Sequence, residues 1–300
     1  MKLIPLIIII GILFVVIAAA FLFIRTARNM AFTLVYPAPN PVTTTPDSVG
    51  IKTWEEVTFT SGDLQLEGWF IPPSADENGA TLIFVHGWQG NRTAQLKQAA
   101  MLHQHGYGAL LFDLRNSGNS QGNASTWGYA EANDVQAAYD YLLTRPEVDP
   151  GRIGVAGFST GGAAVSRAAA RIPGIKSVLI ESTYTALVDN LGNVATLLGG
   201  RIPAYPPLVL WFMGRETGLP LKDIRPVDDL TQIAPRPIMF MQGTNDVVVN
   251  QSHSQQLFKA ASEPKKLYLA PNAGHGEVFS SNPEEFEKQV IPFLDTYLRE

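Results

Sequence analysis

The chain begins with an apolar stretch that no charged residue interrupts. Residues 3–24 contain no charged or strongly polar side chain. About 20 apolar residues cross the hydrocarbon core of a bilayer as a helix. The pattern therefore predicts an N-terminal transmembrane anchor over residues 1–28. A cleavable signal peptide is the alternative, because residues 18–20 are three alanines that fit a cleavage site.

Proline and threonine follow this apolar stretch. Residues 37–46 include four prolines and three consecutive threonines, a composition typical of an extended segment without regular structure. We therefore predict a linker over residues 29–50 and one domain over residues 51–300.

Two hydrophobic patterns divide this domain. Apolar and polar residues alternate over residues 56–60 and 64–70, around a Ser-Gly-Asp turn, which predicts an antiparallel hairpin. Later runs are continuously apolar, as in strands buried on both faces of a parallel sheet: residues 81–85, 108–112, 152–156, 177–180, 237–241 and 266–269. Helical periodicity begins near Arg92, Tyr129, Ser159, Ser252 and Pro283. This alternation predicts an α/β fold of three layers with a mostly parallel sheet.

One segment, residues 184–233, interrupts the alternation. It is rich in Leu, Pro, Gly and aromatic residues, with Tyr-Pro-Pro-Leu-Val-Leu-Trp-Phe-Met at its centre. We expect it to form a small cap over the site at the carboxyl ends of the strands. An ordinary crossover helix with irregular ends is the alternative.

Composition and charge exclude several classes of function. The absence of cysteine excludes a disulfide framework, a thiolate nucleophile and a zinc-thiolate site. A net charge of −5 offers no basic surface for nucleic acid, so no nucleic-acid partner is expected. Lys2 before the apolar stretch nearly balances Arg25 and Arg28 after it, which leaves the membrane orientation open. The very short N-terminal tail before a long domain favours an extracytoplasmic domain.

The sequence Gly157-Phe-Ser-Thr-Gly161 follows a predicted buried strand and opens an Ala-rich helix. A G-x-S-x-G motif between a strand and a helix is the context of a nucleophilic serine on a sharp turn. The glycines leave room for the neighbouring strand and helix, and the helix N-terminus favours a developing oxyanion. Ser159 is therefore the candidate nucleophile.

A serine hydroxyl needs a base, and a carboxylate that orients the base. His275 lies in a glycine-flanked loop after the last apolar run and is the candidate base. Asp246 follows the strand predicted at residues 237–241 and is the candidate acid, with Glu181 as the alternative. The order Ser159, Asp246, His275 is the order of an α/β-hydrolase triad. His103, His105 and His253 are expected to have ordinary structural roles.

Two backbone N–H groups should stabilise the oxyanion. Thr160, directly after the nucleophile, is one candidate. The other is Trp88, with Gln89 as the alternative, in the loop after the strand at residues 81–85. His86 in the same loop and Asp113 after the next strand are expected to hold their loops in place.

These motifs, together with His86-Gly-x-x-Gly90 and Asp113-x-Arg115, resemble those of α/β-hydrolases over roughly residues 55–300. The chain looks most like single-pass membrane members similar to prolyl-oligopeptidase-like, acylaminoacyl-peptidase-like and Bem46-type (depalmitoylase-like) hydrolases. The resemblance implies hydrolysis of an ester, thioester or amide through an acyl-enzyme, without metal or cofactor. Asn116-Ser117 departs from the usual glycine-containing loop, and the chain carries no propeller domain of a strict oligopeptidase.

Ester or thioester cleavage is the main functional prediction, because an apolar acyl chain suits an aromatic cap and the anchor suits a lipid-derived substrate. A serine peptidase is the alternative. A non-catalytic, membrane-bound binding scaffold is a third interpretation, disfavoured because every role of the triad is filled. Haloalkane dehalogenases and epoxide hydrolases are excluded by Ser159, since they use an aspartate at this turn.

Overall fold

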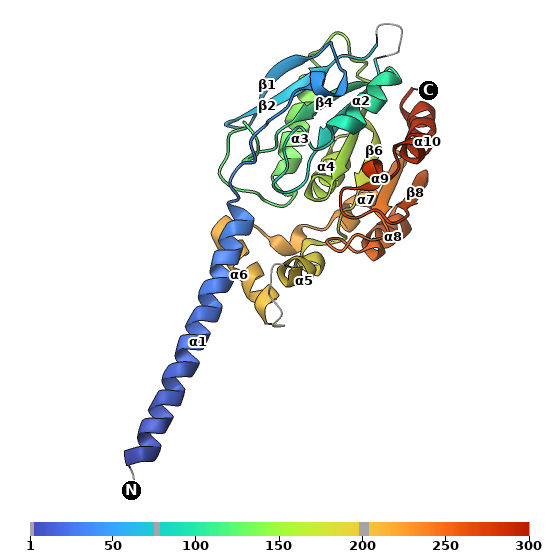
Figure 1. Cartoon of the computed structure of the whole chain (residues 1–300). Coiled ribbons are helices and arrows are strands. Elements are labelled where there is room, and N and C mark those ends of the chain that lie inside the picture. Colours follow the sequence, from blue (N-terminus) through green and yellow to red (C-terminus); the bar gives the residue numbers. More distant parts are fainter. Residues whose placement is uncertain (1–2, 75–78, 198–203, 300) are drawn as a thin grey trace.

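A long N-terminal helix projects from an α/β domain that is built on an eight-stranded sheet (Figure 1). The structure is a computed structural model and describes residues 3–74, 79–197 and 204–299. The strands are β1 (Glu55–Ser61), β2 (Leu64–Ile71), β3 (Thr81–Val85), β4 (Gly108–Phe112), β5 (Ile153–Phe158), β6 (Ile175–Glu181), β7 (Ile238–Gly243) and β8 (Lys265–Ala270). Each predicted strand is present, and most extend one or two residues beyond the predicted ends.

The sheet is mostly parallel, as predicted. Its order is β1-β2-β4-β3-β5-β6-β7-β8, and β3 to β8 pair with one another in parallel. The strand β2 pairs antiparallel with both β1 and β4. The predicted hairpin is the β1–β2 pair, in which Ser61 lies opposite Leu64. Continuous burial along β3 and β4 explains their unbroken apolar sequences.

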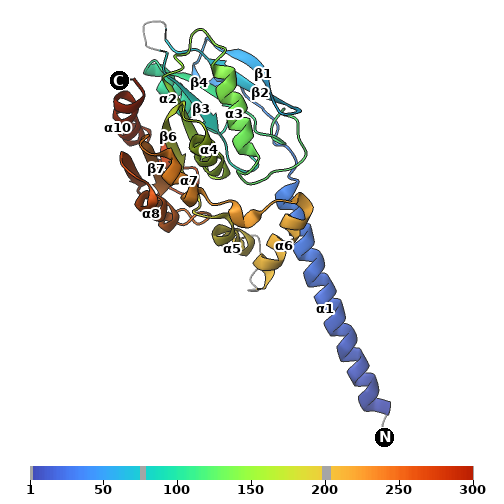
Figure 2. The ribbon, with the colours of Figure 1, turned by 180° about the vertical axis from the view of Figure 1, so that it is seen from behind.

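Helices cover both faces of the sheet and complete the three layers (Figures 1 and 2). One face packs against a cluster of side chains from α3 (Glu131–Leu142), α4 (Thr160–Arg171), α7 (Pro226–Ile233) and α8 (Gln251–Ala260). The other packs against α2 (Leu96–Gln104), α9 (Val278–Ser281), α10 (Pro283–Leu294) and the terminal turn Asp295–Arg299. The predicted helix starts at residues 129, 159, 252 and 283 fall within two residues of the observed ones, whereas α2 starts later than residue 92.

The N-terminal helix α1 spans Leu3–Val35 and is long and apolar enough to cross a membrane. Its apolar residues 3–24 are nearly all exposed and would extend roughly 33 Å at 1.5 Å per residue. The helix continues to Val35, so residues 29–35, predicted as linker, are helical. The reason is a stripe at helical spacing, Ala27, Ala31, Leu34 and Val35, which is fully buried against the domain.

The predicted linker is extended beyond this helix but is held against the domain. Residues 37–45 have no regular structure, and a 3₁₀ turn, Pro46–Val49, follows. Asn91 Nδ2 donates to the carbonyls of Asn40 and Pro41, and Asn116 Nδ2 donates to the carbonyl of Pro37.

The segment predicted as a cap, residues 184–233, follows β6 and has two parts that pack differently. It contains α5 (Leu187–Leu197), α6 (Tyr205–Thr217) and a 3₁₀ turn, Leu221–Asp223; residues 198–203 lie outside the described residues. The helix α7 is the ordinary crossover helix, because Leu230 and Ile233 join the sheet's own core. The two were joined in one predicted segment because no predicted strand separates α6 from α7.

Candidate active site

The candidate residues gather at the carboxyl edge of the sheet. Pairing of β5 with β6 places Phe158 beside Glu181, and pairing of β7 with β8 places Gly243 beside Ala270. The segments that follow β5, β7 and β8 therefore leave the sheet at the same edge, and they carry Ser159, Asp246 and His275.

Ser159 occupies a strained turn between β5 and α4. Its φ and ψ are 54° and −118°, in a region that residues other than glycine rarely adopt. The flanking glycines permit this turn, because a Cβ on Gly157 would lie 2.5 Å from the carbonyl oxygen of Gly161. A Cβ on Gly161 would overlap the carbonyl oxygen of Val85. Tight packing around a strained backbone fixes the direction of the Ser159 hydroxyl.

A chain of hydrogen bonds links Ser159, His275 and Asp246. With the ring hydrogen on Nδ1, His275 donates to Asp246 Oδ2 at 2.8 Å, and Nε2 accepts from the Ser159 hydroxyl at 3.1 Å. Asp246 Oδ1 accepts the backbone N–H groups of Val248 and Val249 at 2.9 and 2.8 Å. Burial opposes ionisation of Asp246, but these bonds and the charge of His275 outweigh it and hold the pKa of the carboxyl below its usual value.

Three further side chains that were not predicted support this arrangement. Gln242 Nε2 donates to Asp246 Oδ2 at 2.9 Å, and Thr183 Oγ1 donates to the carbonyl of Ser159 at 2.6 Å. The ring of Phe158 packs on that of His275 with centroids 4.8 Å apart. The one available signal was Gln242, a polar residue directly after the strand predicted at residues 237–241.

The predicted oxyanion residues lie at one small cavity. Trp88, Gln89 and Thr160 all line it, and a Cβ on Gly87 would lie 3.1 Å from the Cβ of Ser159. Thr160 is the first residue of α4, where backbone N–H groups have no partner within the helix. The loop after β3 and the start of α4 thus meet beside the Ser159 side chain.

The membrane-helix candidate α1 contacts this loop directly. The carbonyl of Leu34, in its last turn, accepts the indole N–H groups of Trp88 and Trp127 at 3.0 and 3.2 Å. The two indoles stack with centroids 5.7 Å apart. No pattern in the sequence indicates that Trp127 contacts residues 34 or 88. These contacts between Leu34 and the two tryptophans, called the clamp below, were therefore not predicted.

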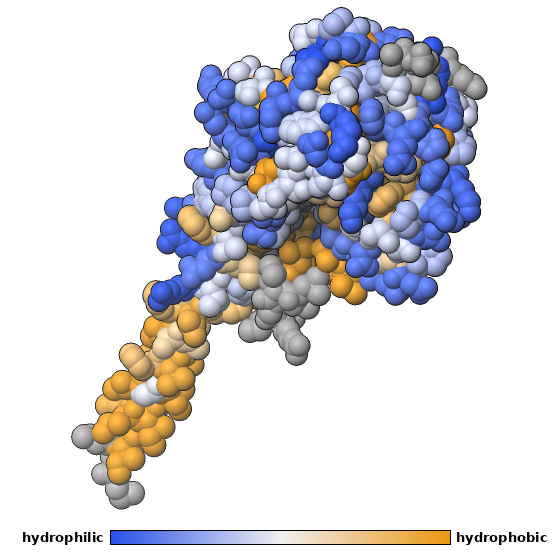
Figure 3. All heavy atoms as spheres, turned by 45° about the horizontal axis from the view of Figure 1, so that its top comes forward, coloured by the Kyte–Doolittle hydropathy of each residue, from blue (hydrophilic) through white to orange (hydrophobic). Residues whose placement is uncertain are grey.

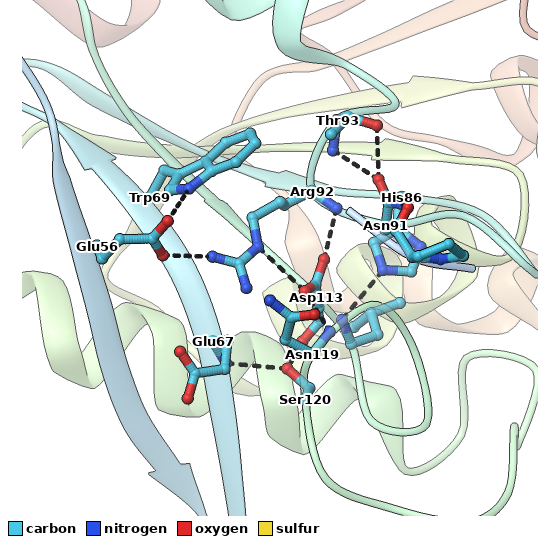
Figure 4. A network of polar contacts seen from close by, with 12 residues as sticks. Glu56, Glu67, Trp69, His86, Asn91, Arg92, Thr93, Asp113, Asn119 and Ser120 are labelled. Carbon is cyan, nitrogen blue, oxygen red and sulfur yellow. Dashed lines mark hydrogen bonds and ion pairs between the residues drawn. The ribbon is translucent and has the colours of Figure 1, made fainter. Parts of the chain in front are cut away.

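A buried ion pair between Arg92 and Asp113 anchors the same loop to the end of β4 (Figure 4). Asp113 accepts from the backbone N–H groups of Arg92 and Asn119 at 2.6 and 2.9 Å and from Arg92 Nε at 3.0 Å. His86 donates from Nδ1 to the carbonyl of Gly87 at 2.8 Å, and its Nε2 accepts from Leu114 N–H at 3.0 Å. Burial lowers the pKa of His86 and keeps the ring neutral. The structural roles predicted for Asp113 and His86 are confirmed.

Removing Asp113 should destabilise the domain strongly. The Asp113→Ala variant leaves the guanidinium of Arg92, whose side chain is 1% exposed, without its buried partner. Loss of one partner of a buried pair costs about 3–5 kcal/mol. Denaturant unfolding in detergent measures the loss. The matched control is Glu56→Gln, whose side chain is 60% exposed and which should cost less than about 1 kcal/mol. Equal losses in the two variants would contradict a buried, structural Asp113.

Glu181, the alternative acid, lies behind the triad rather than in it. Its Oε2 accepts from Gln98 Nε2 at 3.2 Å, whereas His275 Nδ1 is bonded to Asp246. Burial raises the pKa of Glu181 to about 7, against the opposing hydrogen bond from Gln98 and the charge of His275.

This shift makes stability depend on pH. The ordinary pKa of the Glu181 carboxyl is 4.5 and the folded pKa is about 7, so the folded protein holds an extra proton between these values. Stability from this group therefore falls as the pH rises through that window. We expect Glu181→Gln to raise the unfolding midpoint at about pH 8 but not at about pH 5. The exposed control Glu284→Gln should change neither midpoint. If wild type and Glu181→Gln have equal unfolding midpoints at both pH values, the pKa of Glu181 is not raised.

The remaining histidines have structural contacts, as expected. His253 Nδ1 accepts from Thr185 N–H at 3.3 Å, His103 Nδ1 contacts the carbonyl of Tyr107 at 3.3 Å, and His105 Nε2 contacts Glu287 at 2.8 Å. Within the described ranges, no group of three or more His, Asp or Glu side chains is placed to hold a metal ion.

Known proteins share this fold and sequence pattern. A family model described as the alpha/beta hydrolase family matches residues 82–289. The protein YfhR of Escherichia coli K12, whose function is uncharacterised, is 30% identical over 290 residues, which cover 94% of this chain and 92% of that protein. The esterase Pf2001 of Pyrococcus furiosus superposes with a TM-score of 0.73 at 24% identity, covering 88% of this chain and 98% of that one. The acylaminoacyl peptidase of Pyrococcus horikoshii superposes with a TM-score of 0.63 at 19% identity, covering 86% of this chain but 44% of that one. The chain belongs to the alpha/beta hydrolase family.

Proposed function

We propose that the protein is a membrane-anchored serine hydrolase that cleaves carboxylic esters or thioesters. The observation that carries this proposal is the hydrogen-bond chain from Ser159 through His275 to Asp246, on a strained turn between strand and helix. A hydroxyl bonded to an imidazole that a carboxylate orients is the arrangement of an activated nucleophile.

The proposed reaction has two steps. The Ser159 oxygen attacks the acyl carbon while His275 Nε2 takes the hydroxyl proton, and the backbone N–H groups of Trp88 and Thr160 stabilise the oxyanion. The bond to the leaving oxygen or sulfur then breaks, and His275 returns the proton to the departing group. Water, deprotonated by His275, attacks the acyl-enzyme and releases the carboxylic acid and free Ser159.

The proposed substrate is an apolar, lipid-derived acyl ester or thioester. Support comes from α1, whose exposed apolar stretch is long enough to cross a bilayer, and from the apolar cap helices beside it. Esters and thioesters are preferred over amides because their leaving groups depart more readily. The extracytoplasmic placement of the domain stays a prediction from the short N-terminal tail.

A panel of p-nitrophenyl esters of graded chain length tests the proposal, with matched thioesters and p-nitroanilides as the other arms. The detergent-solubilised protein is first labelled with a fluorophosphonate probe, which reports an activated serine. We expect labelling, and turnover of esters and thioesters above that of anilides. Faster anilide cleavage would support a peptidase, and a folded protein that takes no label would support a non-catalytic scaffold.

A further inference from the structure

Over residues 205–213 the cap helix α6 is apolar around its whole circumference, and Arg215, Glu216 and Thr217 lie in its last turn. One side is buried against α1 and the rest of the cap through Tyr205, Val209, Phe212 and Met213. On the other side Pro207 and Trp211 are exposed, and Trp211, at 55%, is the most exposed of the five tryptophans. A helix segment that is apolar on every side is usually buried in a core or in lipid. We therefore expect an apolar partner on the exposed side of α6.

The position of α6 along α1 indicates what surrounds it. Its first residue, Tyr205, packs on Phe23 with ring centroids 5.5 Å apart. Near its other end, Glu216 lies 3.8 Å from Arg28. The helix α6 therefore runs beside α1 from the end of the apolar stretch, residues 3–24, towards the domain. Figure 3 shows apolar surface on the side of the domain from which α1 leaves. With residues 3–24 in a bilayer, the exposed side of α6 would lie at the membrane–water interface, where tryptophan and basic residues are enriched.

A groove opens on this exposed side. Its volume is about 750 Å³, within the usual range of small-ligand sites. The helices α5 and α6 and the segment after α6 line it, with Val188, Leu210, Trp211, Leu219 and Leu221 forming most of its apolar wall. No residue of the candidate triad lines the groove, so it is separate from the site at Ser159.

Two cations lie at this groove. Arg215 lies over the ring of Trp211, 5.6 Å from the centroid, and Lys222 is exposed on the segment opposite. Among the described residues, neither side chain forms a salt bridge, and Asp223 is the one acidic residue in the lining. An apolar wall beside two unpaired cations and one carboxylate matches a ligand with an acyl chain and an anionic head.

We propose that this groove binds an anionic phospholipid of the bilayer, with an acyl chain along Leu210, Trp211 and Leu221 and the phosphate near Arg215 and Lys222. The proposal rests on the proposed membrane placement of α1 and is independent of the hydrolytic chemistry. It gives the cap a lipid-binding role distinct from covering the active site.

Quenching of tryptophan fluorescence by brominated lipids tests it. The full-length protein is placed in phosphatidylcholine vesicles that contain a minor fraction of phosphatidylglycerol or phosphatidylcholine with brominated acyl chains. The difference between wild type and Trp211→Phe isolates the signal of Trp211. We expect Trp211 to be quenched more by the brominated anionic lipid, with Arg215→Gln and Lys222→Gln each reducing that preference about fivefold.

Two variants separate the groove from general membrane contact. A Cβ on Gly214 would meet no atom closer than 3.7 Å, so Gly214→Phe can be accommodated and would fill the groove beside Leu219 and Leu221. We expect it to abolish the anionic preference while the unfolding midpoint stays unchanged. The variant Phe14→Trp reports on the membrane directly, because Phe14 is 72% exposed in the middle of the apolar stretch.

Each outcome decides the proposal. If the indole introduced by Phe14→Trp is quenched but Trp211 is not, α6 lies outside the membrane and the proposal is overturned. Equal quenching of Trp211 by both lipids, or an unchanged preference in Gly214→Phe, shows interfacial contact without a site and also overturns it. Absence of quenching of the introduced indole refutes the membrane placement and therefore overturns the proposal as well. Esterase activity tests only the proposed function, so the two proposals can fail separately.

Discussion

Replacing Ser159 with alanine is expected to abolish acyl-enzyme formation and lower kcat by about 10⁶-fold, the scale seen when a triad serine is removed. The variant keeps the strained turn and the oxyanion donors but has no oxygen to attack the acyl carbon. His275→Ala should lower turnover by about 10²-fold or more, since the hydroxyl, 3.1 Å from Nε2, then has no base. Single-turnover acylation and fluorophosphonate labelling measure both losses.

The double variant sharpens this prediction. Because the nucleophile and the base act as one unit, Ser159→Ala combined with His275→Ala should be no slower than Ser159→Ala alone. Ser252→Ala, at an exposed position of α8, serves as the control for nonspecific labelling. Strong labelling that survives in Ser159→Ala would move the nucleophile to another residue.

Replacing Asp246 with asparagine should lower kcat by about 10⁴-fold with little change in fold. Both carboxylate oxygens of Asp246 accept hydrogen bonds, from His275, Gln242, Val248 and Val249. An amide group at this position turns an N–H towards some of these donors. If that N–H faces His275, the ring carries its hydrogen on Nε2 and can no longer accept the proton of Ser159.

Glu181→Gln is the matched control for this variant, because Glu181 is the other carboxylate at this edge of the sheet. Its partner is Gln98, so Glu181→Gln should retain most of the activity. The reverse result, an active Asp246→Asn and an inactive Glu181→Gln, would identify Glu181 as the acid. The pH profile of kcat/KM, recorded for both variants, separates a lost base from a misfolded site.

The positions of the strands along the chain and the three candidate catalytic side chains could be read from the sequence because they depend on local patterns. Each motif comes directly after an apolar strand, and parallel pairing brings such positions to one edge whatever the loops do. Glycines at 157 and 161 indicate a turn that other residues cannot make. The acid was the less certain member, since Glu181 ends β6 and Asp246 follows β7, and the hydrogen bond of the His275 ring distinguishes them.

Contacts between distant apolar surfaces could not be read in this way. Ala27, Ala31 and Leu34 would suit lipid as well as protein, so the sequence did not reveal that they pack against the cap. The clamp between Leu34 and two tryptophans depends on positions 54 and 93 residues apart, which no local pattern connects. The crossover helix α7 was joined to the predicted cap because no predicted strand separates it from α6, and the packing partners of the two helices distinguish them.

The hydrogen bonds at the carbonyl of Leu34 limit how the domain can turn about α1. A catalytic domain on a flexible tether turns freely, and its substrate entrance spends part of the time facing away from the bilayer. Here two indoles bonded to one carbonyl, together with the buried stripe of α1, remove that rotational freedom. With α1 in a bilayer, the effective concentration of bilayer substrate at Ser159 would therefore be set by the tilt of α1 rather than by the length of residues 37–45.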